Sequence, residues 1–360
     1  MIKNSGTVSE SHPMNGGDGV YSYTKNSSLQ RAATNVAKTK MDDAIAEKLD
    51  VSSECTFRIA DLGCSVGPNT LIAVQNIIDA VQHKYQLSQA PASHTPEFQV
   101  FFNDHVSDDF NTLFASLPPK RPYFAAAVPG SFHGRLFPES SLHFVHSSYA
   151  LQWLSKVPEE LLNKNSASWN KGRVHYTSAP DEVAHAYGAQ FAEDMAVFLD
   201  ARAKELVTGG LMVIIMPAIP NGIPHSRTPA GLMFDLLGFS LMDMAKEGLI
   251  SEAQVDSFNL PVYAASVKEI TELVERNGCF SIERMEITTP RQSSIDGPAS
   301  RQACTMHLRA GMEGIITKHF GAEIIDQLFH RFHKKTEEFS DMMESSSKEG
   351  TQIFIVLKRV

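Results

Sequence analysis

Two acids and a pair of glycines in the first third of the chain have the types and spacing of a ligand-binding loop. Asp61 ends a short apolar run that begins at Phe57, and Gly63 and Gly67 follow it. Glycine lets the backbone turn sharply and approach a ligand closely, and a helix that begins near Asn69 would present free N–H groups. Residues 57–85 therefore predict a strand, a tight loop and a helix, with a nucleotide-like ligand lying across the loop.

The second acid, Asp104, follows another apolar run at residues 98–102, where its carboxylate can accept hydrogen bonds from ribose hydroxyls. The dinucleotide fingerprint Gly-x-Gly-x-x-Gly is absent, which disfavours a pyrophosphate-binding dehydrogenase. The competing interpretation is that the glycines only allow a close turn from strand to helix. The ligand that both acids favour is an adenosine derivative without a pyrophosphate, and S-adenosylmethionine fits that description.

The elements that must position these residues alternate along the chain. Apolar runs typical of strands stand at residues 98–102, 124–128, 142–148 and 211–216, and helical patterns stand at 29–49, 109–117 and 181–207. Continuous apolar runs are typical of parallel strands that are buried on both faces, so the alternation predicts an α/β protein with a doubly wound sheet. Ligands bind at the carboxyl ends of such strands, where Asp61, Asp104, Ser131 and Ser148 fall.

One segment breaks this rhythm. Residues 217–275 open with a proline-rich stretch and continue into a helical pattern at 229–248 that is rich in Met, Phe and Leu. We expect a helical substrate-binding cap here, although such a stripe is also typical of plain core. Residues 13–216 and 276–360 then form the α/β core, with strands at 280–287 and 351–358 and two helices between 301 and 343. Residues 1–12 are expected to be disordered, and the segment around Tyr23 is expected to act as a lid.

Composition narrows the class of protein. A formal net charge of −9 and a pI near 5.9 disfavour nucleic-acid binding, so a small molecule is the expected partner. No apolar run reaches the length of a bilayer, which predicts no membrane span and a cytoplasmic location. The four cysteines Cys55, Cys64, Cys279 and Cys304 form no C-x-x-C pair, so neither a disulfide framework nor a zinc site is indicated.

Several short motifs together resemble the plant SABATH methyltransferases over nearly the whole chain. They are Met14-Asn15-Gly16-Gly17, Ser22-Tyr23, Gln30, Asp61-Leu62-Gly63-Cys64-Ser65, Gly67-Pro68-Asn69, Phe102-Asn103-Asp104, Val128-Pro129-Gly130-Ser131-Phe132 and Ser147-Ser148-Tyr149-Ala150-Leu151 with Trp153. Members of this family transfer the methyl group of S-adenosylmethionine to the carboxylate of a small acid or, in the caffeine branch, to a ring nitrogen. The segments at 101–105 and 170–177 are most similar to members that act on iridoid acids.

The resemblance implies a fold and a set of site residues. The fold is a Rossmann-like class I methyltransferase sheet of seven strands whose last hairpin is antiparallel, and the family implies a homodimer. With the loop residues above, the cofactor-binding set is Tyr23, Asp61, Gly63, Cys64, Asn69, Asp104, His105, Ser131, Phe132 and Ser148. The substrate-binding set is Gln30, Tyr149, Gln152, Trp153 and, from the cap, His225 and Phe234. Some members hold Mg²⁺, and the matching positions are Asn170, Asp256, Phe258 and Asn259.

The expected mechanism is an in-line displacement. A carboxylate is already ionised at pH 7, so no general base is needed and catalysis rests on orientation and removal of water. We expect Gln30 and Trp153 to be catalytic, because a neutral amide and an indole N–H can hold the acceptor oxygen in line. For Trp153 the alternative is a core aromatic, and for Gln30 a solvated side chain. His146 is expected to be structural.

Two other functions stay open at this stage. Asn15 stands where carboxyl-methylating members often have Lys, and Met-Asn-Gly-Gly is typical of caffeine synthases, which favours N-methylation of a xanthine or alkaloid ring. Caffeine synthases replace the glutamine that this chain keeps as Gln30, which favours a carboxylate instead. A protein that binds S-adenosylmethionine without turnover is the remaining possibility, and the intact Gln30 and Trp153 argue against it.

Overall fold

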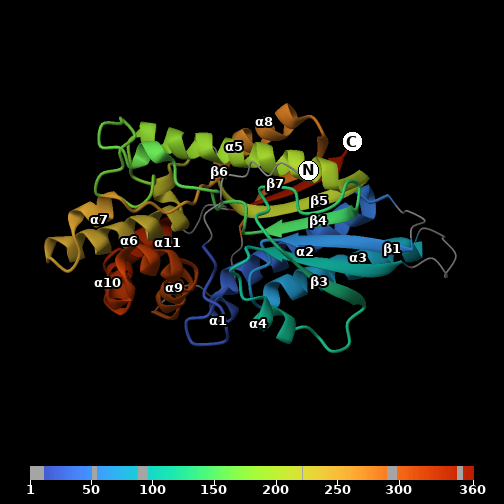
Figure 1. Ribbon diagram of the computed structural model, residues 1–360, viewed down its shortest axis with the longest axis horizontal. Coiled ribbons are helices and arrows are strands. Elements are labelled where there is room, and N and C mark those ends of the chain that lie inside the picture. The colour runs from blue at the N-terminus through green and yellow to red at the C-terminus, as the bar shows by residue number, and fades with distance from the viewer. Residues whose placement is uncertain (1–11, 51–54, 88–95, 221, 290–297, 347–351) are drawn as a thin grey trace.

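A mixed β-sheet with helices on both faces organises the chain (Figure 1). The computed structural model describes residues 12–50, 55–87, 96–220, 222–289, 298–346 and 352–360. The strands are β1 (Thr56–Leu62), β2 (Glu97–Asp104), β3 (Tyr123–Pro129), β4 (Leu142–Ser148), β5 (Leu206–Ile219), β6 (Ala265–Ser266), β7 (Phe280–Thr288) and β8 (Gln352–Arg359). The order across the sheet is β3-β2-β1-β4-β5-β8-β7, and the short β6 pairs with β5.

The first five strands pair in parallel, and β8 lies antiparallel between β5 and β7. The predicted seven-stranded class I methyltransferase sheet with an antiparallel final hairpin is therefore confirmed, with β6 as a small addition. Register places Asp61 of β1 beside His146 of β4, and Leu62 beside Asn103 of β2. The carboxyl ends of the parallel strands thus meet at one edge, which is where the acids were predicted.

Strand β5 shows why the apolar runs are continuous. Leu211, Val213 and Ile215 belong to the apolar cluster formed with α2 (Ser28–Lys48) and α3 (Pro68–Leu87). Met212 and Ile214, which alternate with them, belong to the cluster formed with α5 (Asp181–Glu205) and α8 (Val267–Asn277). Because successive side chains point to opposite faces and both faces are covered by helices, every position from Leu211 to Met216 is apolar.

A separate group of helices lies at the side of the sheet (Figure 1). The group consists of α6 (Pro229–Lys246), α7 (Glu252–Asp256), α9 (Pro298–Phe320), α10 (Ile325–Glu338) and α11 (Ser340–Ser346). Leu236 and Leu237 of α6 share an apolar cluster with Leu328 and Phe332 of α10. We call this group the helical cap. The remaining short helices are α1 (Tyr23–Asn26), α4 (Phe110–Ala115), η2 (Glu159–Leu161), η3 (His225–Arg227) and η4 (Ala322–Ile324).

The cap differs from the predicted segment 217–275 in two ways. The predicted core helices α9 and α10 pack in the cap, because their apolar residues face α6 and not the sheet. Conversely α8, which lies at the end of the predicted cap, packs on the sheet through Ile270 and Val274. Of the predicted disordered segment 1–12, only His12 lies among the described residues.

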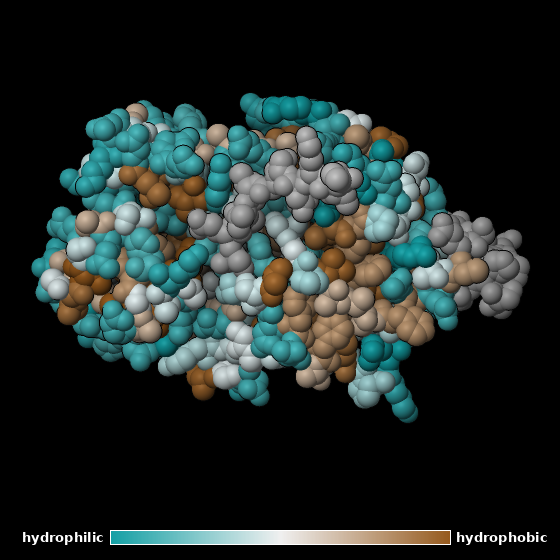
Figure 2. Space-filling model, viewed as in Figure 1, coloured by the Kyte–Doolittle hydropathy of each residue, from teal (hydrophilic) through white to brown (hydrophobic). Residues whose placement is uncertain are grey.

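The lengths of the helices and the character of the surface concern the predictions about membrane and protein partners. No helix among the described residues combines the length and apolar character needed to cross a membrane. Figure 2 shows apolar surface on the side where Figure 1 draws α3 and β3. Strand β3 forms an edge of the sheet and carries Phe124, whose side chain is largely exposed.

Candidate functional site

A cavity opens at the carboxyl edge of the parallel strands. Its walls come from the loop after β1, the ends of β2 and β4, the start of α2 and the segment that precedes α1. Every predicted cofactor-binding residue except Ser131 lines this cavity, namely Tyr23, Asp61, Gly63, Cys64, Asn69, Asp104, His105, Phe132 and Ser148. The Ser131 hydroxyl oxygen instead accepts a hydrogen bond from the backbone N–H of His133 at 3.3 Å.

Gly63 is the residue that lets the loop after β1 approach the turn after β4. Its φ is +76°, and a Cβ at this position would lie 2.2 Å from the Cβ of Ala150. Both the left-handed backbone and the close contact require glycine. Because Ala150 also lines the cavity, the missing side chain fixes the distance between two of its walls.

The carboxylate of Asp104 is fixed by backbone donors. One oxygen accepts from the N–H of Ser65 at 2.8 Å, and the other accepts from the N–H of His105 at 2.7 Å. Burial raises the pKa of Asp104, while these two hydrogen bonds oppose the rise. An acid held in this way, with lone pairs to spare, is suited to accept hydrogen bonds from a ribose.

Asp61 is held differently. Its carboxylate accepts a hydrogen bond from the hydroxyl of Thr70, and its other oxygen lies 2.7 Å from Nδ1 of His146. Its charge therefore orients His146, whose Nε2 is buried and has no hydrogen-bond partner among the described residues. Both Asp61 and His146 line the cavity. His146 therefore lies in the candidate site, in addition to the structural role that was predicted for it.

A buried ion pair shapes the loop that carries Phe132 and His133 into the cavity. Nε of Arg202 lies 2.7 Å from Glu205, and the guanidinium also donates to the carbonyls of Phe132 and Gly134 at 2.9 and 2.8 Å. Glu205 in turn accepts from the N–H of Leu136 at 2.6 Å. Burial lowers the pKa of His133 to about 4, so this ring enters the cavity as a neutral imidazole.

Polar atoms without partners gather in the cavity. Gln30 Oε1, Ser65 Oγ, Asp108 Oδ2, His133 Nδ1 and His146 Nε2 are buried, have no hydrogen-bond partner among the described residues, and belong to residues that line the cavity. Buried polar groups in proteins are nearly always hydrogen-bonded. The cavity is therefore shaped for a ligand that supplies several donors and acceptors.

Three predicted acceptor residues also line the cavity, namely Gln30, Tyr149 and Trp153. The backbone of Tyr149 is left-handed, with φ at +54°, and its hydroxyl donates to Gln352 at 2.9 Å. Gln152 is buried outside the cavity lining, and its amide donates to the carbonyl of Tyr149 at 2.7 Å. In this arrangement Gln152 supports the strained turn that presents Tyr149 and Trp153.

The two predicted cap residues lie outside the cavity lining as well. Nε2 of His225 is 3.0 Å from the hydroxyl of Tyr176, and the ring of Phe234 lies 4.5 Å from that of His175. His175 is bonded to Thr177 and to the carbonyl of Val262, and burial lowers its pKa to about 3. These side chains form an aromatic layer behind the turn that carries Trp153. The polar atoms of the layer bond to one another and to nearby backbone.

The segment before α1 covers one side of the cavity, as the predicted lid would. His12, Pro13 and Met14 line it, and the His12 ring centroid lies 6.1 Å from that of Trp153. Asn15 points the other way, since its amide donates to the Tyr21 carbonyl and to Glu313 of α9, each at 3.3 Å. The lid is thereby attached to the helical cap.

The predicted magnesium ligands stand close to one another, away from this cavity. The amide of Asn170 donates to Oδ1 of Asn259 at 2.7 Å, and Asp256 accepts from the N–H of Gly172 at 2.8 Å. This pairing agrees with the alternative of polar loop residues that bond to one another. Oδ1 of Asn170, however, is buried without a hydrogen-bond partner among the described residues. A buried amide oxygen without a donor fits a hard cation such as Mg²⁺, which prefers oxygen ligands.

Four titratable residues that line the cavity were not predicted from the sequence: His12, Asp108, His133 and His146. His146 had a usable signal, because a polar residue inside the apolar run 142–148 must find a buried partner. Asp108 stands four positions after Asp104, in a loop whose path the sequence does not specify. His12 and His133 gave no local signal.

The comparisons with known proteins agree with this geometry. A family model described as "SAM dependent carboxyl methyltransferase" matches residues 9–360. The chain is 48% identical over 360 residues to loganic acid O-methyltransferase of Catharanthus roseus, covering 98% of this chain and 95% of that protein. It is 40% identical over 353 residues to farnesoic acid carboxyl-O-methyltransferase of Arabidopsis thaliana, covering 98% of this chain and all of that protein.

A solved structure of loganic acid methyltransferase with SAH superimposes with a TM-score of 0.91 at 48% identity, covering 96% of this chain and 98% of the other. The family resemblance and the cofactor expected from the sequence are thus confirmed. The chain belongs to the SABATH family of carboxyl methyltransferases and is an enzyme that uses S-adenosylmethionine.

Proposed function

We propose that this enzyme makes the methyl ester of a small plant acid whose carboxylate is held by Gln30 and Trp153. The observation that supports the proposal most is that Gln30, Tyr149 and Trp153 line the same cavity as the cofactor-binding residues. The Gln30 amide also has unused hydrogen-bonding capacity there, because its Oε1 has no partner among the described residues. Since the oxygen and nitrogen of an amide can exchange places by rotation, either end can meet an acceptor.

Bound S-adenosylmethionine supplies the methyl group, and the residues of the chain orient the acceptor and exclude water. A carboxylate is ionised at neutral pH, so the Gln30 amide and the Trp153 indole N–H need only hold one oxygen in line. Neutral donors suit this task, because a full positive charge would compete for the lone pair that attacks. The lid residues Pro13 and Met14 bring apolar surface to the cavity wall, which keeps water from the reacting oxygen.

The names of two relatives narrow the range of acids that we expect this enzyme to methylate. Two relatives are named for loganic acid and farnesoic acid, and this supports an iridoid, terpenoid or aromatic carboxylate as the acceptor. In the aromatic layer behind Trp153, His225 and His175 already bond to Tyr176, Thr177 and the Val262 carbonyl. We expect Ile223, Met233, Phe234 and Leu237 to influence specificity through the shape of the layer behind Trp153.

The alternative acceptor is a xanthine or alkaloid ring nitrogen, which Asn15 favoured. The position of Asn15 weakens that case, because its side chain bonds to Tyr21 and Glu313 and is not among the residues that line the cavity. Asn15 occupies the position where other members have a lysine, but its side chain does not point into the cavity, where it could bond to a purine. A carboxylate remains the preferred acceptor.

Transfer of an isotope-labelled methyl group, screened over a panel of acids and xanthines, tests the proposal. We expect base-labile ester products from one or a few apolar acids and no labelled product from the xanthines. Labelled N-methyl products would contradict the proposal. So would the absence of any product from an enzyme that binds SAH normally.

Three further predictions accompany this proposal. We propose that Mg²⁺ is held by Asn170, Asp256, the Phe258 carbonyl and Asn259, supported by the Asn170 oxygen that has no partner among the described residues.

We propose a homodimer, for which the apolar surface on the β3 side is a candidate contact, and light scattering after size exclusion would measure its mass. The cytoplasmic location stays a prediction that imaging of a tagged protein can check.

A further inference from the structure

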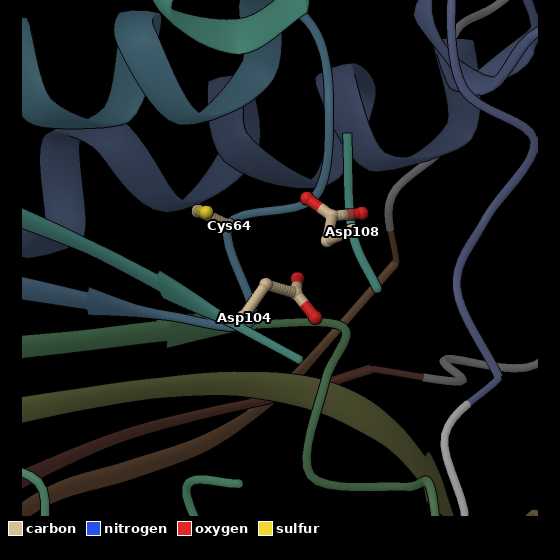
Figure 3. A group of neighbouring side chains, drawn as sticks. All are labelled: Cys64, Asp104 and Asp108. Carbon is tan, nitrogen blue, oxygen red and sulfur yellow. The ribbon is translucent and has the colours of Figure 1, made fainter. Parts of the chain in front are cut away.

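A second carboxyl group stands beside Asp104 in the cavity. Figure 3 shows Asp104 and Asp108 together with Cys64, which come from the end of β2, the loop that follows it and the loop after β1. One ligand atom from each residue lies within 4.8 Å of the others. Asp104 and Asp108 therefore face the same small volume, and a ligand that reaches one of them also meets the other.

The two acids differ in their supply of donors. Asp104 accepts two backbone N–H hydrogen bonds, from Ser65 and His105. The Asp108 side chain is only 8% exposed, and its Oδ2 has no hydrogen-bond partner among the described residues. A buried carboxylate oxygen without a donor is costly, and a molecule in the cavity can supply the missing donor.

We propose that Asp108 is a second cofactor-binding acid, which accepts a hydrogen bond from one ribose hydroxyl of the bound cofactor while Asp104 accepts from the other. A ribose carries two adjacent hydroxyls, and this matches two adjacent carboxyl groups: Asp104 already accepts two backbone N–H hydrogen bonds, while Asp108 keeps one oxygen without a donor among the described residues. The proposal rests on the assignment of this cavity to S-adenosylmethionine and adds a residue that the family motifs did not indicate.

Electrostatics give the proposal a measurable consequence. Burial and the neighbouring charge of Asp104 raise the pKa of Asp108 to about 7, while a hydrogen bond from the Asp109 backbone opposes the rise and the charge of Asp109 adds to it slightly. Burial also raises the pKa of the Cys64 thiol, so Cys64 stays neutral, and His105 is the titratable neighbour on the Asp104 side. In the empty cavity Asp108 thus binds a proton near neutral pH.

A hydroxyl donor stabilises the ionised carboxylate, so cofactor binding should release this proton. Affinity then rises with pH up to about pH 7 and levels off above it, because the folded enzyme loses the proton before binding. The sign follows from a carboxyl whose pKa is lower in the complex than in the empty cavity.

Calorimetric titration of SAH into the wild type and Asp108→Asn tests the proposal, with Asp79→Asn as the matched control on an exposed face of α3. Loss of a hydrogen bond to a charged group corresponds to about tenfold in affinity. We expect Asp108→Asn to bind SAH about tenfold more weakly than the wild type at pH 8. Its affinity should change little between pH 8 and pH 6, whereas that of the wild type and the control should fall about tenfold.

Analogues of SAH that lack the 2′- or the 3′-hydroxyl identify the partner atom. One of them should bind the wild type and Asp108→Asn equally, since the contact is absent in both cases. The inference is overturned if Asp108→Asn matches the wild type at pH 8, if it keeps the pH dependence, or if both analogues lose affinity additively with the variant. If the wild type itself failed to bind SAH, the assignment of the cavity would fall instead.

Discussion

The side of the cavity that we propose for the cofactor and the side that we propose for the acceptor are built in different ways. The cofactor side comes from turns that immediately follow β1, β2 and β4, so that Asp61, Gly63 and Asp104 are placed by their own strands. The acceptor side is assembled from the lid, the start of α2 and the turn after β4, and the lid is bonded to a helical cap whose parts are far apart in sequence. Short motifs specify the first kind of site, whereas the second depends on long-range packing.

This difference explains which residues the sequence could predict. Nearly all the predicted cofactor residues line the cavity, because a strand that ends in an acid or glycine delivers that residue to the sheet edge. Gln152, His225 and Phe234 were expected at the acceptor, yet they pack behind Tyr149 or within the cap. Their local sequence shows an apolar helix and a loop but does not show which face meets the ligand.

The fold follows the same rule. The strands and the doubly wound sheet could be predicted from alternating apolar runs, and the helix predicted at 29–49 is α2 with nearly the same ends. The partner of α9 and α10 could not be predicted, because an amphipathic helix packs equally well on a sheet or on another helix. The contact of α10 with α6 and that of α9 with α10 assign them to the cap.

The largest effect should come from the cofactor side. In Gly63→Ala the new Cβ would meet Ala150, whereas in Gly248→Ala no atom lies within 4 Å at a nearly identical φ of +77°. Both changes impose a left-handed alanine at a cost of about 1 kcal/mol, and the clash should add about 1–3 kcal/mol at Gly63 alone. We expect Gly63→Ala to lose measurable SAH binding in calorimetry, while Gly248→Ala binds as the wild type. Equal effects of the two variants would show that the close approach to Ala150 is unimportant.

On the acceptor side, Trp153→Phe keeps the aromatic ring and removes the indole N–H. We expect kcat/KM for the acid to fall about 10- to 100-fold, as for the loss of a hydrogen bond to a charged group, with SAH affinity unchanged. The control is Trp169→Phe, because Trp169 lies under Lys171 at the surface. Steady-state kinetics and SAH titration separate the two sides. A parallel loss of SAH affinity would place Trp153 on the cofactor side instead.

The acid sensitivity of the cap should be a smaller effect. Burial lowers the pKa of His225 to about 4, below the value of about 6.5 in the unfolded chain. The folded state thus resists protonation, so stability is constant above about pH 6.5 and falls below it by up to about 1.4 kcal/mol per pH unit for this group. Denaturant unfolding at several pH values should show a shallower fall for His225→Gln. The exposed control His330→Gln should follow the wild type. If the stability of His225→Gln also fell with pH as steeply as that of the wild type, the prediction would be wrong.

Metal removal should have the smallest effect, because the proposed site offers a single carboxylate and lies away from the cavity. We expect a chelator to lower Tm by about 2 °C and leave kcat nearly unchanged, and Mg²⁺ to restore the Tm of the wild type but not of Asp256→Asn. Thermal melts of the chelated protein check this. A loss of activity on chelation that Mg²⁺ restores would tie the metal to the acceptor side.

A crystal structure with SAH and the unmethylated acid substrate would show directly whether Gln30 and Trp153 hold the carboxylate. The account predicts that one carboxylate oxygen lies within hydrogen-bonding distance of the Gln30 amide and the Trp153 indole nitrogen, on the side of the SAH sulfur from which the methyl group departs. An acid bound with its carboxylate elsewhere, or turned away from that sulfur, would contradict the account.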